Sequence, residues 1–160
     1  MNLRTGIGID VHPFVEGRPL VLGGVIIPFG KGLEGNSDGD VLIHAVIDAL
    51  LGGAALGDIG THFPPGDERY HGIASGVLLT DTLKLLEAAL WRVEYVDATI
   101  LAERPIFRPF MGQMKESMAQ LLGLSEGSLN LKATTTDGLG YIGRGEGISC
   151  TAVATITRIE

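Results

Sequence analysis

Two histidines and one aspartate are the residues best suited to hold a catalytic metal ion. Apolar and polar residues alternate from Ile7 to His12, which predicts a strand with Asp10 and His12 on the same side. His44 follows in a predicted helix. Two imidazole nitrogens and one carboxylate oxygen suit zinc, and three protein ligands leave a fourth position open to water or substrate. A polar strand end without a metal is the alternative for the Asp10/His12 pair alone.

The helix that carries His44 is predicted to run from about Gly39 to Ala54. Good N-cap residues precede it: Ser37 and Asp38. Asp40, His44 and Asp48 recur every four residues and therefore share one stripe of the helix. A carboxylate one turn away could hold the second nitrogen of a metal-bound histidine. An ordinary contact between an acid and a histidine on a solvated helix face is the alternative.

Hydrophobic patterns predict the elements that must position these residues. Arg4 to His12 should be a strand that Pro13 ends, because proline cannot donate to a β-ladder, so Asp10 and His12 should lie at its tip. A second strand is predicted from Leu20 to Pro28, with a bulge or a close backbone approach at Gly23-Gly24. Further helices are expected over Ile73 to Arg92 and Pro109 to Gly123, and further strands over Tyr95 to Ala102, Leu129 to Thr134 and Ile148 to Ile159. The segments expected to be loops are Phe29 to Asn36 and Gly138 to Gly147.

This order of elements predicts one α+β domain over residues 1–160. We expect two layers, a four- to five-stranded mixed sheet with three helices on one face. The other sheet face also carries apolar residues, and 45% of the chain is hydrophobic. Symmetric association of several copies would cover that face.

Charge and cysteine content narrow the classes of function. The chain has 19 acidic and 12 basic residues, a net charge of −7, and no cluster of Lys and Arg, which argues against nucleic-acid binding. A phosphate-rich ligand would therefore need metal ions or backbone amides to neutralise it. Cys150 is the only cysteine and should be a small buried hydrophobe. The N-terminus has no apolar signal segment, so we expect a cytoplasmic protein without a membrane span.

Two further stretches offer candidate polar sites. Asp58 follows the His44 helix and is either a third carboxylate aimed at the same site or an ordinary Asx turn. Thr134, Thr135 and Thr136 end a predicted strand and run into Asp137. The threonines are β-branched strand residues in the simpler interpretation. Alternatively, the carboxylate holds Mg²⁺ while the hydroxyls contact phosphate oxygens.

Six motifs, taken in order, resemble a known family. They are IDVHPF, SDGDVLIHAVIDALLG, LGDIG, FPP, KATTTDGLG and GRGEGI. Their combination is similar to the 2-C-methyl-D-erythritol 2,4-cyclodiphosphate synthases of the non-mevalonate isoprenoid pathway. The resemblance covers nearly the whole chain, and the combined motifs are specific although each one alone is not.

The resemblance implies a homotrimer whose sheets pack around a threefold axis, with active sites at the subunit interfaces. Asp10, His12 and His44 match the family's ligands for zinc or another divalent ion. Asp48 resembles the acid that supports this site. Asp137 matches the carboxylate that binds a second metal, Mg²⁺ or Mn²⁺, together with the substrate diphosphate.

The resemblance also assigns a substrate site for a small molecule linked to cytidine diphosphate. Asn36 and Ser37 fall where the family contacts phosphate, and Thr135 could donate a hydrogen bond to the transition state, with Thr136 beside it. The erythritol positions correspond to Asp58, Ile59, Gly60, Phe63, Pro64, Pro65, Gly66 and Asp67. The cytidine pocket corresponds to the segment from Ala102 to Arg108 (Ala102, Pro105, Ile106, Phe107 and Arg108), with Thr134 and Thr135 from the neighbouring subunit. Tyr141 and Arg144 fall in the loop lining the ligand site and the axial cavity, where an isoprenoid diphosphate could bind.

Several residues depart from the family's pattern. Asn36 replaces a usual histidine, and a neutral amide can donate to phosphate but carries no positive charge. Asp137 replaces a usual glutamate and is one methylene shorter. Pro65 replaces a common aspartate and Ile106 a frequent lysine, for which Arg108 is a possible substitute.

The implied reaction is the cyclisation of 4-diphosphocytidyl-2-C-methyl-D-erythritol 2-phosphate with release of CMP. It needs no protein nucleophile. Two alternatives stay open: a zinc-dependent phosphoester hydrolase with Asp58 as general base, and a non-catalytic trimer that binds isoprenoid diphosphates through Arg144. Asp40 gains no role from the resemblance and is interpreted as a first-turn acid favourable to the helix dipole.

Overall fold

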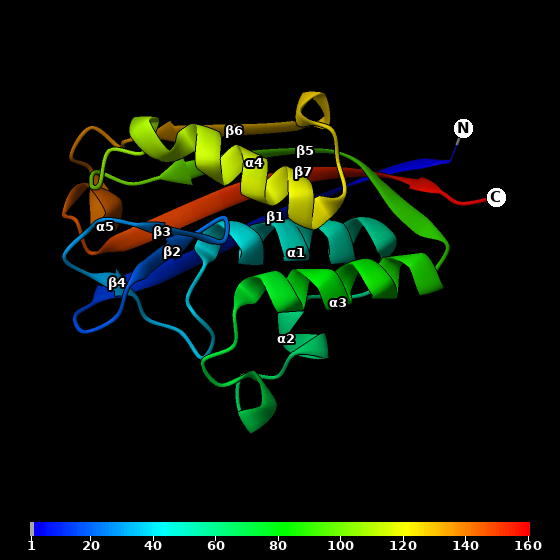
Figure 1. The fold of residues 1–160 in the computed structure, drawn as a ribbon, viewed down its shortest axis with the longest axis horizontal. Coiled ribbons are helices and arrows are strands. Elements are labelled where there is room, and N and C mark those ends of the chain that lie inside the picture. Colours follow the sequence, from blue (N-terminus) through cyan, green and yellow to red (C-terminus); the bar gives the residue numbers. More distant parts are fainter. Residues whose placement is uncertain (1) are drawn as a thin grey trace.

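A five-stranded mixed sheet forms the centre of the computed structural model, which describes residues 2–160 (Figure 1). The strand order is β4-β1-β7-β5-β6, and only β5 and β6 run parallel. The strands of this sheet are β1 (Leu3–Val15), β4 (Gly32–Leu33), β5 (Trp91–Leu101), β6 (Leu129–Thr134) and β7 (Gly147–Arg158). Both chain ends lie at one end of the molecule, since Leu3 pairs with Thr157.

Three helices cover one face of this sheet, which confirms the predicted α+β class. α1 (Val41–Ala54) packs on β1 and β7, α4 (Met111–Leu122) packs on β6, and α3 (Ser75–Ala88) runs along α1 (Figure 1). The shorter elements are β2 (Leu20–Leu22), β3 (Val25–Ile27), α2 (Ile59–His62), α5 (Gly140–Gly143) and the 3₁₀ turns η1 (Glu68–Tyr70), η2 (Arg108–Phe110) and η3 (Glu126–Ser128). None of the helices formed by residues 2–160 has the length and hydrophobicity needed to cross a bilayer.

Two glycines allow α1 to lie directly on β1. A Cβ atom at Gly8 would stand 1.9 Å from the carbonyl oxygen of Ala45, and one at Gly6 would stand 2.0 Å from that of Ala49. Any larger residue would push the helix away from the strand. The glycines therefore allow the short distance between the backbones of β1 and α1, and this distance brings His44 on α1 close to β1.

The side of β1 that carries Asp10 and His12 faces α1, and the apolar side faces away from the helices. Ile7 and Ile9 are each 62% exposed and Val11 is 48% exposed. Tyr95 on β5 and Val153 on β7 are exposed as well. The sheet face opposite the helices therefore carries the uncovered apolar surface that the sequence predicted.

β1 continues through Pro13 to Val15, so the predicted strand end is wrong. The carbonyl oxygen of Pro13 accepts from the Glu34 amide at 2.9 Å, whereas the next amide, that of Phe14, donates to Glu146 beside β7 at 2.9 Å. Because the N and O atoms of one residue point the same way in antiparallel pairing, the Pro13 nitrogen faces β4 and not β7, so the ladder between β1 and β7 loses no bond. Asp10 and His12 therefore lie within the strand and not at its tip.

The predicted strand from Leu20 to Pro28 is instead the hairpin of β2 and β3. Gly23 and Gly24 form its turn with φ of 60° and 74°, a conformation that favours glycine. Their amides donate to the carboxylate of Asp40 at 3.0 and 2.8 Å. The Gly-Gly pair between two short apolar runs is itself a hairpin signal, whereas its attachment to Asp40, sixteen or seventeen residues away, leaves no local pattern.

Asp40 is the N-cap of α1, which begins at Val41, two residues later than predicted. Its carboxylate accepts the Ile43 amide at 3.0 Å and is fully buried. Burial raises the pKa of Asp40 to about 6, although the amides of Gly24 and Ile43 oppose the rise. This residue therefore joins the hairpin to the helix.

Other predicted boundaries shift where the backbone turns. The predicted helix from Ile73 to Arg92 ends at Ala88, because Leu90 adopts a left-handed φ of 62° and Trp91 already belongs to β5. Gly123 ends α4 in a left-handed conformation, as predicted. The two predicted loops contain β4 and the single turn of α5.

Candidate metal centre

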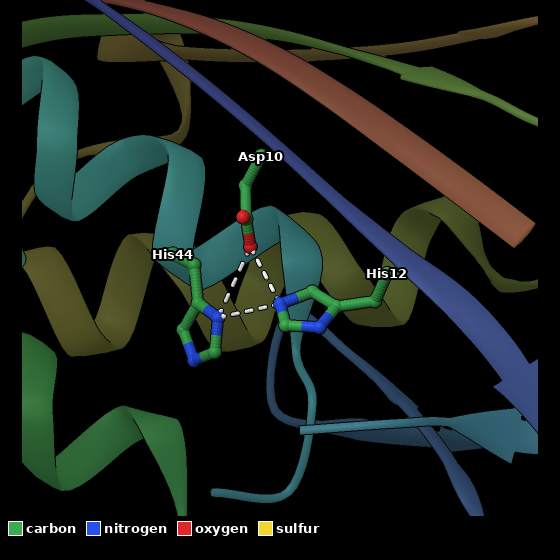
Figure 2. Close-up of side chains that lie close together, drawn as sticks. All are labelled: Asp10, His12 and His44. Carbon is green, nitrogen blue, oxygen red and sulfur yellow. Dashed lines mark hydrogen bonds and ion pairs between the residues drawn. The ribbon is translucent and has the colours of Figure 1, made fainter. Parts of the chain in front are cut away.

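Asp10, His12 and His44 converge as the sequence predicted (Figure 2). Asp10 Oδ2 lies 2.8 Å from His12 Nε2 and 3.1 Å from His44 Nδ1, and the two nitrogens are 3.1 Å apart. Asp10 and His12 come from β1, and His44 reaches them from the first turn of α1. One strand and one helix therefore supply a compact triad of ligand atoms.

The chemistry and spacing of the triad fit a divalent metal ion. Ligand atoms around a tetrahedral zinc ion lie about 3.3 Å apart, slightly more than the spacings of 2.8 to 3.1 Å in the triad. A small outward movement of the side chains would admit an ion. The set of two nitrogens and one oxygen leaves a further position for a ligand from the adjoining pocket.

Electrostatics within the triad favour a charged carboxylate. Burial pushes the pKa of Asp10 upward, but the neighbouring imidazole rings of His12 and His44 outweigh it and lower the pKa to about 2. Burial lowers the pKa of His12, and the stronger combined effect of the hydrogen bond and the charge of Asp10 raises it above its ordinary value. The carboxylate thus attracts either a proton on His12 or a metal ion.

The second ring nitrogen of His44 meets hydroxyl groups and not the predicted acid. His44 Nε2 lies 3.0 Å from Ser37 Oγ and 2.9 Å from Ser75 Oγ. Asp48 instead accepts the Ile59 amide at 2.7 Å. The prediction that Asp48 holds this nitrogen is wrong, because the His44 ring reaches across to α3 and not along its own helix.

A pocket of about 210 Å³ opens beside the triad. Several residues predicted to bind substrate line it: Asn36, Ser37, Ile59, Gly60, Phe63 and Pro65. Two residues that the sequence did not suggest, Tyr70 and Leu78, complete the wall. The structure therefore places an apolar wall and two polar side chains next to the ligand atoms.

A neighbouring cavity of about 390 Å³ shares Asn36 and Pro65 with this pocket. Gly66 and Asp67 line it as well, beside Glu68 and His71. The other two predicted residues of this region, Asp58 and Pro64, accept hydrogen bonds that hold the local backbone conformation. Asp58 caps α2 through the Thr61 amide and hydroxyl, whose hydrogen bonds lower the pKa of Asp58, and the Pro64 carbonyl accepts the Asp67 amide.

A cavity of about 630 Å³ lies beyond the ends of β5 and β6. The predicted cytidine-pocket residues line it: Ala102, Pro105, Ile106, Phe107, Arg108, Thr134 and Thr135. The two threonines come from the same chain as the other residues, which corrects the expectation that a neighbouring subunit supplies them. Thr134 and Thr135 lie next to the segment from Ala102 to Arg108 because β5 and β6 are adjacent and parallel, so the C-terminal ends of these strands lie side by side.

Thr136 and Asp137 form the turn that follows β6. Glu103 holds this turn by accepting the amides of Thr136 and Gly138 at 3.0 and 3.2 Å. Asp137 has a left-handed φ of 54° and an exposed side chain. The carboxylate is therefore presented to solvent beside the 630 Å³ cavity.

The predicted residues Tyr141 and Arg144 lie on and just after α5. Arg144 pairs with Glu146 at 2.9 Å, and both side chains are exposed. Tyr141 is 45% exposed. Neither residue lines the triad pocket of the single chain, so the structure does not bring them together with Asp10 and His44.

Three supporting residues lacked a local signal in the sequence. Arg18 donates to the carbonyl oxygens of Gly35 and Ser37 at 2.9 and 2.5 Å and so shapes the loop above the triad. Ser75 and Glu103 act on segments more than thirty residues away. Only the type of each residue, an arginine or a serine at a helix start, could have drawn attention to them.

Sequence comparisons place nearly the whole chain in one family. Residues 3–157 match the YgbB family. A curated 2-C-methyl-D-erythritol 2,4-cyclodiphosphate synthase of Desulfatibacillum aliphaticivorans is 54% identical over 152 residues, 95% of this chain and 98% of that protein. The protein of the same name from Carboxydothermus hydrogenoformans is 50% identical over 159 residues, 99% of this chain and 98% of that protein.

Solved structures show the same fold. The bifunctional IspDF of Campylobacter jejuni matches with a TM-score of 0.94 and 39% identity, over 99% of this chain and 43% of that one. A CDP-bound 2C-methyl-D-erythritol-2,4-cyclodiphosphate synthase matches with a TM-score of 0.88 and 35% identity, over 96% of this chain and 99% of that one.

Proposed function

The chain belongs to the YgbB family of 2-C-methyl-D-erythritol 2,4-cyclodiphosphate synthases, and from that premise we propose how its residues carry out the reaction. The enzyme is a cyclising lyase. The 2-phosphate of 4-diphosphocytidyl-2-C-methyl-D-erythritol 2-phosphate attacks the β-phosphorus of the same molecule. The bond from that phosphorus to the oxygen shared with the α-phosphate breaks, and CMP leaves.

Asp10, His12 and His44 hold the first divalent ion, for which zinc is the best match to two nitrogens and one carboxylate oxygen. A bound ion of this kind polarises a phosphoryl oxygen and offsets its charge. The low pKa of Asp10 supports the assignment, because the carboxylate stays ionised at neutral pH. Asp48 accepts the Ile59 amide and so ties the start of α2, which lines the pocket beside the triad, to α1.

The remaining residues of the site act by orientation and hydrogen bonding. The side chains of Asn36 and Ser37 lie in the triad pocket and can donate to the phosphate groups. Ile59, Gly60 and Phe63 hold the erythritol unit. Folding one molecule so that its two ends meet can contribute roughly 7–11 kcal/mol of the rate acceleration.

The active site forms between subunits. The triad pocket and the 630 Å³ nucleotide cavity are separate in one chain, although a single substrate must occupy both. The exposed apolar sheet face, with Ile7 and Ile9 each 62% exposed, provides the surface on which copies associate. In the homotrimer, the nucleotide cavity of one subunit lies next to the triad of another, and Thr135 can donate to the transition state.

Asp137 binds the second ion, Mg²⁺ or Mn²⁺, together with the substrate phosphates. Its exposed carboxylate is a single ligand, and Mg²⁺ is commonly held by one or two carboxylates plus phosphate oxygens and water. We expect Asp137→Ala to raise the Mg²⁺ concentration needed for half-maximal CMP release by about tenfold. An unchanged Mg²⁺ titration would contradict this role.

The observation that carries the function is the convergence of Asp10, His12 and His44 within 3.1 Å beside a pocket that Asn36 and Ser37 also line. The test is incubation with the cytidylyl substrate in ¹⁸O-labelled water, with assays for CMP and for the cyclic product. We expect equal amounts of both and no ¹⁸O in the product. A linear product with ¹⁸O would indicate a hydrolase, and binding without turnover would indicate a carrier.

A further inference from the structure

Two buried hydroxyl groups hold the ring nitrogen of His44 that faces away from the triad. Nε2 lies 2.9 Å from Ser75 Oγ and 3.0 Å from Ser37 Oγ. Behind Ser75, Asp38 Oδ1 accepts the Ser75 hydroxyl at 2.5 Å. We propose that Ser75 and Asp38 are positioning residues that fix the His44 tautomer with its proton on Nε2, which leaves Nδ1 free to bind the metal ion. The proposal rests on the metal site of the proposed function.

The directions of the hydrogen bonds follow from what each group can donate. Asp38 is surrounded by donors, since it also accepts the amides of Ser75 and Asp40 at 3.1 Å each. An ionised carboxylate only accepts, and a hydroxyl has one proton. The Ser75 proton therefore goes to Asp38, and Ser75 Oγ must accept from His44 Nε2. A neutral imidazole that donates from Nε2 presents a lone pair at Nδ1.

Ser37 does not impose a direction in the same way. Its Oγ accepts the Gly39 amide at 3.3 Å and lies 3.3 Å from Ser75 Oγ. No carboxylate among residues 2–160 takes its hydroxyl proton, so this hydroxyl can either donate to Nε2 or accept from it. Ser75 is therefore the partner that determines the tautomer of His44.

The backbone holds the two residues rigidly against each other. Asp38 precedes α1 and Ser75 is the first residue of α3, and the amide of Asp38 donates to the Ile73 carbonyl at 3.0 Å. Ser75 has no exposed surface. Asp38 also caps α3 through the Ser75 amide, because Ala74 at the cap position has no side-chain acceptor. A test must therefore separate positioning of His44 from stabilisation of α3.

The first measurement is zinc affinity by competition with a chromogenic chelator, in Ser75→Ala and Asp38→Asn. We expect each to bind zinc about 10–100-fold more weakly than the wild type. Asp38→Asn should be at least as weak as Ser75→Ala although it preserves size. Its amide group can donate to Ser75 Oγ, which turns the Ser75 proton toward Nε2 and disfavours the required tautomer. Asp81→Asn, which removes the same charge from an exposed pair with Lys84 on α3, should bind zinc normally.

The second measurement is ¹⁵N NMR of labelled histidine in metal-free wild type at a pH where His44 is neutral. The expected form carries the proton on Nε2, and the opposite tautomer would overturn the proposal even if both variants failed to fold. Wild-type zinc affinity in folded Ser75→Ala and Asp38→Asn would overturn it as well. His44→Ala distinguishes failure of the positioning proposal from failure of the metal site on which it rests. If that variant also kept wild-type zinc affinity, the proposed metal site itself would be wrong.

Discussion

Asp40 and His44 lie four residues apart at the start of α1, but Asp40 stabilises the fold whereas His44 belongs to the candidate metal site. The carboxylate of Asp40 is fully buried and is enclosed by three amides, those of Gly23, Gly24 and Ile43. The hydrogen bonds satisfy the amides of the buried residues Gly23 and Ile43 and that of Gly24 in the exposed part of the turn. This region is complete without any ligand, and its role is to fasten the β2/β3 hairpin to the helix.

The region around His44 is the reverse case. Asp10 Oδ2, His12 Nε2 and His44 Nδ1 gather within 3.1 Å of one another, and each of them can present a lone pair. If the proton of a neutral His44 is on Nε2, His12 is the one residue of the three that can supply a proton to this cluster. The comparison teaches that a balance of donors and acceptors marks a structural polar site, whereas a surplus of acceptors marks a site for a cation.

The largest expected effect comes from disturbing the contact between α1 and β1, because α1 carries both Asp40 and His44. Gly8→Ala would place a Cβ atom 1.9 Å from the Ala45 carbonyl oxygen, so α1 would have to move off β1. We expect a loss of at least about 3 kcal/mol in the free energy of unfolding, together with loss of zinc binding. Urea unfolding followed by circular dichroism measures the change.

The matched control is Gly112→Ala, in α4, where a Cβ atom would meet open space. Alanine is the better helix former, so this variant should gain about 0.5–1 kcal/mol. If Gly8→Ala unfolded at the same urea concentration as Gly112→Ala, close packing of α1 on β1 would not explain how the two regions are placed.

The sequence could predict the triad because each member follows a local period. Asp10 and His12 alternate on a strand, and His44 lies in a helix without proline. Gly6 and Gly8 occupy the same side of that strand, but a missing side chain gives no periodic signal, so the close helix contact could not be predicted. The family resemblance then supplied roles, such as the substrate contacts of Asn36, that no spacing could show.

The features that could not be predicted from the sequence depend on contacts between segments that lie far apart in the chain. Ser75 meets His44 across 31 residues, and Asp40 meets Gly23 across 17. The acid one turn from His44, Asp48, had the favourable spacing, yet it binds the Ile59 amide. Helical spacing predicts which residues share one face of a helix. It does not predict toward which neighbouring element a histidine ring is oriented.

The next largest effect should separate the two regions. His44→Ala removes one ligand atom and leaves the Asp40 hydrogen bonds in place, so CMP release should fall by more than about 100-fold while the fold persists. Zinc content by atomic absorption should fall in parallel. Sedimentation and thermal unfolding report whether the assembly and the fold are retained. Full activity in a zinc-free His44→Ala enzyme would end the metal assignment.

The smallest expected effect is the converse change, Asp40→Asn, which should cost stability and leave zinc bound. The amide oxygen can keep the Gly23 and Ile43 amides, but the amide nitrogen then faces the Gly24 N–H, a loss of about 1–2 kcal/mol at pH 5. Zinc affinity should stay at the wild-type value. A large loss of zinc with a stable fold would mean that the two regions are not independent.

The same variant tests the buried charge through its pH dependence. Burial raises the pKa of Asp40 from its ordinary 3.8 to about 6, so the native state binds this proton more tightly than the unfolded chain does. The stability that Asp40 contributes is therefore greatest below pH 3.8 and declines as the pH rises through about 6. Asparagine does not titrate, so the stability difference between wild type and Asp40→Asn should shrink from pH 4 to pH 7. A difference that stayed constant or widened over this range would show that the three amides outweigh burial and keep the carboxylate ionised.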